Sequence, residues 1–245
     1  LTVEQEAKAA LSRQFNALIT TLTIGGEVVY AGSADGRVFV SLDRGTTWMP
    51  PARNEGAAVE SFVVDPQEPR RALVSLRRED AGPVVLQTTN GGLFWYDISA
   101  GLGANSVYGV AADFRSGAVY AATAGGVFWT TTDLTALAIP AAWKRMDGAL
   151  PEGPVLDVKL DALGQTVYSA VHGHGIFYSA APHKQSSIRV VSAADWTERP
   201  AAPGALVSVL GAKLTGVRAG GRPATVLSAG ERESQVQLPF DLDGP

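Results

Sequence analysis

The chain has 245 residues, of which 46% are hydrophobic, and 20 Lys and Arg against 24 Asp and Glu give a net charge of −4. This length and apolar content suffice for one or two domains with a sizeable core, and no basic run reaches the density that nucleic-acid binding requires. No apolar stretch has the about 18 residues that a transmembrane helix needs, and the absence of cysteine excludes disulfides, thiolate catalysis and thiolate metal ligands.

Residues 1–14 predict a helix or linker that leads into the rest of the chain. Thr2 and Gln5 have the spacing of a capping box, in which each side chain bonds the other residue's backbone N–H. Apolar residues then recur at helical intervals at Ala7, Leu11 and Phe15. From Ala17 onward the apolar pattern changes to the alternation that is typical of strands.

Residues 15–182 contain four copies of a strand pair. Three copies place a tyrosine after a valine, at Tyr30, Tyr120 and Tyr168, and a divergent copy has Leu73 at this place. Successive copies are 43, 47 and 48 residues apart. A period of this size, built from short strands and turns, is typical of propeller blades, because one small sheet cannot bury both of its faces alone. The sequence therefore predicts an all-β fold with about four blades of four strands each.

A second pattern follows the strand pair. Residues 41–48 and 88–95 both fit Ser/Thr-x-Asp/Asn-x-Gly-x-x-Trp, and the third copy keeps a threonine and an aspartate ahead of a tryptophan that an insertion delays. The residues of these boxes are Ser41, Asp43, Gly45, Trp48, Thr88, Asn90, Gly92, Trp95, Thr131, Asp133 and Trp143. In a tight turn the Asp or Asn accepts backbone N–H bonds, glycine supplies a positive φ and tryptophan adds apolar surface. We therefore expect structural rather than catalytic roles for these residues.

The boxes resemble the Asp-box, or BNR, repeat of sialidases, sortilin-type receptors, xyloglucanases and photosystem-assembly propellers. The resemblance covers about residues 15–182. It implies a β-propeller of the sortilin/sialidase-like superfamily, in which the boxes lie on the outer rim of the blades and ligands bind in the central channel.

Four blades are at the low end for a propeller. Three explanations remain open: further blades upstream of Leu1, a degenerate blade in the C-terminal segment, or an open ring that pairs with another copy. Unpaired strand edges tend to be covered or to drive association. We expect self-association if the ring is open.

The sequence does not present the residues of the enzymes that the resemblance brings to mind. Sialidases need an arginine triad and a tyrosine nucleophile, but no arginine here lies in the Arg-Ile-Pro context and three tyrosines are equivalent repeat residues. A glycoside hydrolase needs two opposed carboxylates. Asp157, in the expected strand at residues 155–160 of the fourth copy, is the one catalytic candidate. No second carboxylate is evident as its partner. We therefore predict that the protein is not an enzyme.

Two further clusters are candidates for ligand contact. His172 and His174 form a His-x-His pair that could suit a metal on an extended strand, but they lie in a glycine-rich hairpin connection without further ligands nearby, so we predict no metal and no cofactor. Arg77 and Arg78 begin a mixed-charge loop, and propeller loops commonly carry recognition.

After Pro182 the repeat ends, and residues 183–189 predict a polar linker. Alternation at Leu206, Ser208 and Leu210, and again at Val236 and Leu238, predicts strands of a β-sandwich. Residues 190–245 resemble the immunoglobulin-like C-terminal module of large secreted bacterial proteins. Such modules continue for another pair of strands, so we expect an incomplete sandwich. The resemblance implies a secreted, periplasmic or cell-envelope location.

Together these features favour a non-catalytic extracellular or envelope module that binds a glycan, a peptide or a protein through propeller loops. The alternative is a glycoside hydrolase that acts on an extracellular polysaccharide, with Asp157 and a partner from another blade as acid and base. Two carboxylates facing each other across the channel would favour this alternative.

Overall fold

The computed structural model describes residues 2–51, 57–78, 82–103, 106–136, 141–146, 150–184, 189–211, 213–230 and 233–242. The chain divides into two compact units, Leu1–Lys184 and Gln185–Pro245. Strands dominate both units, so the all-β prediction is confirmed.

The N-terminal unit opens with α1 (Val3–Phe15), which starts at the predicted capping box. Gln5 N donates to Thr2 Oγ1 over 3.3 Å, and Thr2 N donates to Gln5 Oε1 over 2.8 Å. The helix ends at Asn16, whose φ of 47° is left-handed. No side chain of α1 is fully buried.

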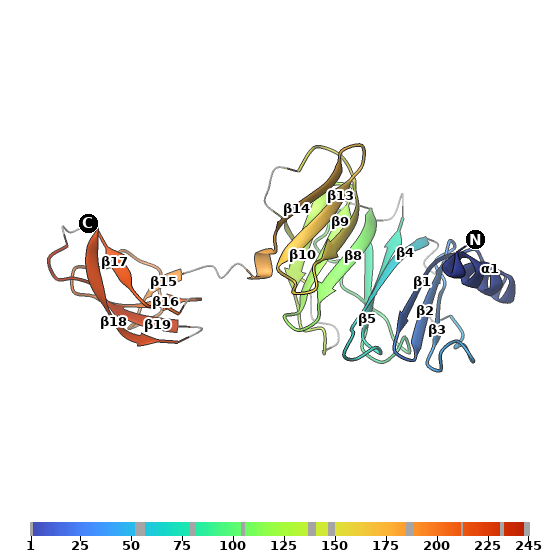
Figure 1. The fold of residues 1–245 in the computed structure, drawn as a ribbon, viewed down its shortest axis with the longest axis horizontal. Coiled ribbons are helices and arrows are strands. Elements are labelled where there is room, and N and C mark those ends of the chain that lie inside the picture. Colours follow the sequence, from blue (N-terminus) through green and yellow to red (C-terminus); the bar gives the residue numbers. More distant parts are fainter. Residues whose placement is uncertain are drawn as a thin grey trace. The chain divides into compact units, whose positions relative to one another are not determined.

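In the described ranges of the N-terminal unit, four small antiparallel sheets follow α1 in chain order (Figure 1). The first sheet contains β1 (Ile19–Gly25), β2 (Val28–Ser33) and β3 (Val38–Ser41). The second sheet contains β4 (Ala58–Val64), β5 (Ala72–Arg77), β6 (Val84–Thr88) and β7 (Tyr96–Asp97). The third sheet contains β8 (Val107–Asp113), β9 (Ala118–Thr123), β10 (Gly126–Thr131) and β11 (Lys144–Arg145). The fourth sheet contains β12 (Val155–Leu160), β13 (Thr166–Val171) and β14 (Gly175–Ala180), and the 3-10 helix η1 (Pro182–Lys184) closes the unit.

The four sheets are arranged as propeller blades. In each sheet the strands follow one another in sequence order, and the first strands β1, β4, β8 and β12 each form one edge. These first strands contact one another from sheet to sheet, β1 with β4, β4 with β8 and β8 with β12. Each sheet therefore packs face to face against the next, as the repeat predicts.

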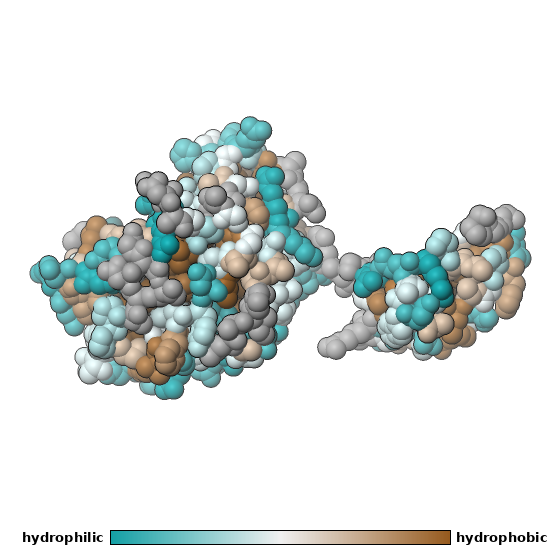
Figure 2. Space-filling model, turned by 180° about the vertical axis from the view of Figure 1, so that it is seen from behind, coloured by the Kyte–Doolittle hydropathy of each residue, from teal (hydrophilic) through white to brown (hydrophobic). Residues whose placement is uncertain are grey.

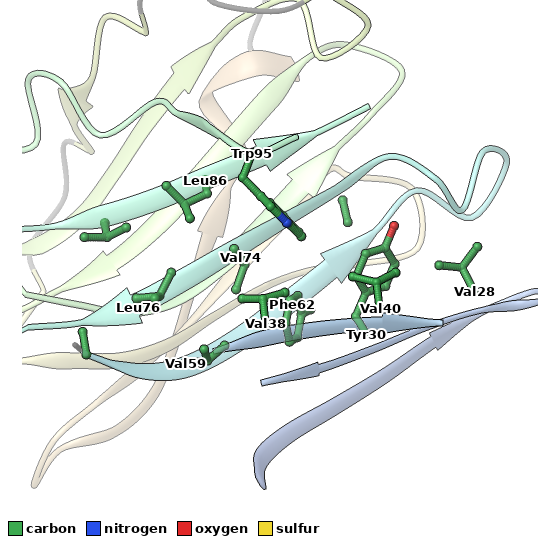
Figure 3. Packing of buried hydrophobic residues seen from close by; sticks show 13 residues of the cluster. Val28, Tyr30, Val38, Val40, Val59, Phe62, Val74, Leu76, Leu86 and Trp95 are labelled. Atoms are coloured by element: carbon green, nitrogen blue, oxygen red, sulfur yellow. The ribbon is translucent and has the colours of Figure 1, made fainter. Parts of the chain in front are cut away.

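Apolar side chains fill the space between neighbouring sheets. Between the first and second sheets, Tyr30, Val38 and Val40 pack against Val59 and Phe62 (Figure 3). Equivalent clusters lie between the second and third sheets and between the third and fourth. The strands alternate because each sheet has one face toward the preceding sheet and one toward the following sheet.

Strand register shows which residues of the repeat are equivalent. Tyr30, Leu73, Tyr120 and Tyr168 pair with the third strand at Val40, Gln87, Trp129 and Tyr178, respectively. Each first strand also has a register shift near its start, between residues 19 and 21, 59 and 61, 107 and 109, and 155 and 157. The equivalence of the copies thus extends to a β-bulge.

The C-terminal unit is one five-stranded antiparallel sheet in the order β15-β16-β19-β18-β17. Its strands are β15 (Arg189–Ser192), β16 (Leu206–Leu210), β17 (Val217–Ala219), β18 (Arg222–Ala229) and β19 (Glu233–Gln237). The core is small, with Val207, Val209 and Val236 at its centre. A sandwich needs two packed sheets, and the described residues of this unit contribute one.

The surface carries apolar side chains in several separate places, drawn in brown among polar residues in Figure 2. None of the helices in the described ranges has the length and apolar character to cross a membrane.

Candidate functional site

The N-terminal unit has a cavity of about 440 Å³ at the ends of β4, β8 and β12. Its wall consists of the turns that lead from these strands into the next ones, at residues 65–67, 112–115 and 160–164, together with Lys184. Three neighbouring sheets contribute the same turn, so the repeat itself builds the cavity. A concave surface that mixes apolar and polar groups in this way is typical of small-ligand sites.

An aspartate holds each of the three turns. Backbone N–H groups two to four residues further on donate to Asp65, Asp113 and Asp161 over 2.9, 3.1 and 2.7 Å. Burial acts to raise the pKa of Asp161, but hydrogen bonds from the backbone of Gln165 and Thr166 outweigh it and lower the pKa below the ordinary value. These three carboxylates therefore shape the cavity as hydrogen-bond acceptors within their own turns.

A buried histidine connects one of these turns to the third sheet. Tyr120 Oη lies 2.6 Å from His183 Nδ1, and His183 Nε2 lies 3.1 Å from Asp113 Oδ2. Lys184 Nζ reaches the same carboxylate oxygen over 2.8 Å. Burial would raise the pKa of Asp113, but hydrogen bonds from Lys184, Ser116 and His183 reverse the shift, so this carboxyl group is ionised.

The charges along this chain of hydrogen bonds are set by burial. Desolvation lowers the pKa of His183, although hydrogen bonding to Asp113 opposes the shift, and burial raises the pKa of Tyr120 to about 12. The contacts fit a neutral imidazole that donates through Nε2 to Asp113 and accepts at Nδ1 from the Tyr120 hydroxyl.

This arrangement corrects the predicted start of the linker. His183 belongs to η1 and its side chain is 1% exposed, so it lies in the N-terminal unit instead of a solvated linker. Residues 185–188 of the predicted linker lie outside the described residues. The sequence reasoning missed this histidine because its partners are 63 and 70 residues away.

Polar and apolar groups remain at the cavity beyond the turn carboxylates. Gln67 and Arg115 are exposed at the rim, and the Arg115 guanidinium makes no ion pair with a described residue. Leu163 is 70% exposed. The cavity thus offers N–H donors beside apolar surface and ionised carboxylates, which suits a neutral polar ligand with hydroxyl or amide groups.

The first box is held by its own side chains. Ser41 Oγ accepts from Gly45 N over 2.8 Å and donates to Asp43 Oδ1 over 2.7 Å. Thr47 donates to Asp43 through its hydroxyl over 2.6 Å and through its backbone N–H over 2.8 Å. These two bonds, of which the hydroxyl bond has the larger effect, lower the pKa of Asp43 to about 2. Gly45 has a φ of 87°. The hydrogen-bonding capacity of Asp43 is thus used within the turn.

The second box repeats this geometry. Thr88 Oγ1 accepts from Gly92 N over 2.9 Å and contacts Asn90 Oδ1 over 3.1 Å. Phe94 N donates to Asn90 Oδ1 over 3.1 Å, and Gly92 has a φ of 83°. An amide side chain therefore replaces the carboxylate without a change of the turn.

The box tryptophans pack against the neighbouring element of the unit. Trp48 packs among α1 and the first sheet, Trp95 lies between the first and second sheets (Figure 3), and Trp143 lies between the second and third. Trp143 Nε1 donates to the carbonyl of Ile98 over 2.7 Å. The buried Trp95 Nε1 has no hydrogen-bond partner among the described residues.

The third box is one residue out of register with the other two. Thr130, not Thr131, pairs with the start of the second strand as Ser41 and Thr88 do, because Val119 faces Thr130. Thr131 is exposed, and Asp133 accepts from the backbone and hydroxyl of Thr135 over 2.8 and 2.6 Å. The motif spacing alone could not reveal this shift.

Asp157 has a structural environment of its own. Its Oδ1 accepts from Val158 N over 2.9 Å and lies 3.1 Å from Lys159 Nζ. A Cβ on Gly109 would lie 2.8 Å from the same oxygen. In the second sheet Ser61 Oγ accepts from Val110 N over 3.2 Å. Gly109 is equivalent to Ser61, but it has no side chain that could accept a hydrogen bond from Val158 N of the fourth sheet. The Asp157 carboxylate accepts this bond instead.

The other predicted ligand contacts lie apart from the cavity. Arg77 Nε donates to Glu60 Oε1 over 2.5 Å, and the carbonyl of Arg78 accepts from Ser106 Oγ over 2.8 Å. His172 and His174 are exposed in the β13–β14 hairpin. In the part of the chain that the structure describes, no three His, Asp or Glu side chains form a group that could hold a metal ion.

No protein-family model matches the chain, and no curated protein matches it. Solved structures with similar folds include a computationally designed protein, Ika8, with 12% identity, coverage of 90% of this chain and 71% of that one, and a TM-score of 0.50. A nidogen/laminin complex has 13% identity, coverage of 67% and 60%, and a TM-score of 0.50. The GH74 xyloglucanase from Xanthomonas campestris has 19% identity, coverage of 89% and 36%, and a TM-score of 0.46. At these identities the similarity concerns the fold alone, and a β-propeller domain is among the similar structures.

Proposed function

We propose that this chain is a non-catalytic recognition module that binds a glycan, a peptide or a segment of another protein in the cavity at the ends of β4, β8 and β12. The observation that supports the proposal is the construction of this cavity from three equivalent turns. The turns are rigid because their own aspartates bond their backbones, while Gln67, Arg115 and Leu163 project from them without structural bonds between their side chains and described residues.

The charge state of the cavity favours binding over hydrolysis. A glycoside hydrolase uses one carboxylic acid with a raised pKa as proton donor, paired with a second carboxylate at about 5–10 Å. Asp113 and Asp161 instead have lowered pKa values, so they are ionised at neutral pH and are poor proton donors. Asp157 bonds its own backbone and Lys159.

We also propose a secreted, periplasmic or cell-envelope location. Residues 190–245 support it, because they resemble the C-terminal module of large secreted bacterial proteins.

The test is incubation of the full chain with a panel of glycans and peptides, with bound material and new reducing ends measured together. A double change of Arg115→Ala and Leu163→Ala should weaken binding of the retained ligand by about tenfold or more. Arg44→Ala is the matched control, because Arg44 is an exposed arginine of the first box that does not line the cavity.

Two results would contradict the proposal. Binding that the double change leaves intact would separate the ligand from the cavity. New reducing ends that disappear in Asp157→Asn would show hydrolysis and identify the protein as an enzyme.

A further inference from the structure

Within the N-terminal unit, the outer face of the fourth sheet is the one sheet face of the series that no described element of this unit covers. Leu156, Tyr168, Ile176 and Tyr178 lie on it with 42, 41, 76 and 77% of their surface exposed. The rings of Tyr168 and Tyr178 lie 6.3 Å apart. We call these four residues the Tyr168 face. Exposed apolar groups of this size and proximity mark interaction sites.

Equivalent residues in the other sheets are buried by the following sheet. Tyr30, Leu73 and Tyr120, which share the register of Tyr168, are each 0% exposed. Val38 and Val127, equivalent to Ile176, are both 1% exposed. The Tyr168 face therefore continues a series of three sheet-to-sheet interfaces, and its matching partner is another sheet of the same repeat.

One sheet of the N-terminal unit has a receiving face that no other described sheet of this unit covers. The faces that receive the preceding sheet are built from residues such as Phe62 and Val74 in the second sheet, and register makes Leu22 and Ala31 their equivalents in the first. On the first sheet this face contacts α1 instead of a sheet.

The helix α1 occupies the place that a preceding sheet has in the other interfaces. Tyr30 stands edge-on to Trp95 of the second sheet, at 6.2 Å between ring centres and 76° between ring planes. Phe15 of α1 stands edge-on to the equivalent Trp48, at 5.1 Å and 77°. Phe15 therefore occupies on the first sheet the place that a repeat tyrosine occupies on the second.

We propose that the Tyr168 face binds the first sheet of a second copy of this chain, with Tyr168 replacing Phe15 against Leu22 and Trp48. The helix α1 acts as a removable cap, since it buries no side chain fully and joins the sheet through the left-handed Asn16. The four described sheets of each N-terminal unit make eight when two copies join head to tail, and eight lies within the roughly 4–8 blades that propellers close with. This inference is independent of the cavity and its ligand.

The experiment is sedimentation velocity of the full chain over a concentration series. Phe15→Ser weakens the cap, because it removes the ring that stacks on Phe39 and stands edge-on to Trp48. We therefore expect about tenfold tighter self-association than in the wild type. Adding Ile176→Asp should abolish association, whereas adding Phe94→Asp, at an exposed residue of the second box that lies on neither proposed face, should not. Circular dichroism and thermal unfolding confirm that each variant is folded.

Disulfide trapping identifies the contact, since the chain has no cysteine. In the Phe15→Ser background, mixing Tyr168→Cys chains with Leu22→Cys chains should give a mixed disulfide under mild oxidation. A monomer at every concentration would overturn the proposal. Tyr168→Cys chains that cross-link only to each other would also overturn it, because the faces would then pair with themselves.

Discussion

The first two sheets and the last two sheets of the N-terminal unit share the same strand register but differ in the surroundings of equivalent side chains. In the first pair, Tyr30 is buried and Thr88 accepts a backbone hydrogen bond. In the last pair, Tyr168 is exposed and the buried Thr130 Oγ1 has no partner among the described residues. Sheets with the same backbone register can therefore differ in their side-chain contacts. Equivalent residues then contribute very different amounts to the free energy of unfolding.

The largest expected difference is between two equivalent tyrosines. Tyr30→Ala should lower the free energy of unfolding by about 3–5 kcal/mol, because the ring fills the space against Phe62 and Trp95. Tyr30 Oη also donates to the carbonyl of Pro69 over 2.8 Å. Tyr168→Ala should cost less than about 1 kcal/mol, as is usual for exposed residues. Urea unfolding at low protein concentration measures both, and equal losses would show that the Tyr168 face is covered in the monomer.

A smaller difference is expected between two buried threonines. Thr88→Val removes the acceptor of Gly92 N and should destabilise the fold by about 1–2 kcal/mol, because a buried donor loses its partner. Thr130→Val replaces a hydroxyl without a partner in the described residues by a methyl group, so it should be neutral or slightly stabilising. The same denaturant experiment decides. A cost for Thr130→Val that matches Thr88→Val would reveal a hidden bond at Thr130.

Trp143→Phe should lower the free energy of unfolding by about 1 kcal/mol more than Trp95→Phe. Both side chains are 9% exposed and lose similar packing. Trp143→Phe also removes the hydrogen bond to Ile98, whereas Trp95 Nε1 has no partner to lose among the described residues. Thermal unfolding of the two variants side by side measures the difference, and a larger loss for Trp95→Phe would contradict it.

The smallest effect concerns pH and again separates equivalent tyrosines. Tyr30 bonds a backbone carbonyl, but Tyr120 bonds His183, whose pKa burial lowers below 6.5. Between the lowered pKa and 6.5 the unfolded chain binds more protons at this residue, so stability should fall as pH decreases through this window. His183→Gln should flatten the pH dependence there. A slope that persists in this variant would assign it to another group.

Much of the fold could be predicted from the sequence because the repeat consists of patterns between residues that are close in sequence. The alternation of Val59, Phe62 and their equivalents, the positive φ of Gly45 and Gly92, and the capping box of Thr2 depend on residues close in sequence. The recurrence of the phrase then indicates how the sheets stack.

The cavity and the Tyr168 face could not be predicted in the same way. Each aspartate of the cavity bonds residues close to it in sequence, but the meeting of the three turns around one cavity depends on how three sheets stack. The pairing of His183 with Tyr120 joins residues 63 apart without any motif. The exposure of Tyr168 is invisible in a sequence that gives it the same context as Tyr30 and Tyr120.

The β-bulge near the start of every first strand has a consequence for solubility. β1, β4, β8 and β12 are edge strands, and a straight edge strand presents a regular row of unpaired backbone groups on which a foreign strand can add. A bulge interrupts that row at residues 19–21, 59–61, 107–109 and 155–157. The edges are thereby poor templates for fibre growth, which leaves side-chain recognition between sheet faces as the safer route for this chain to associate.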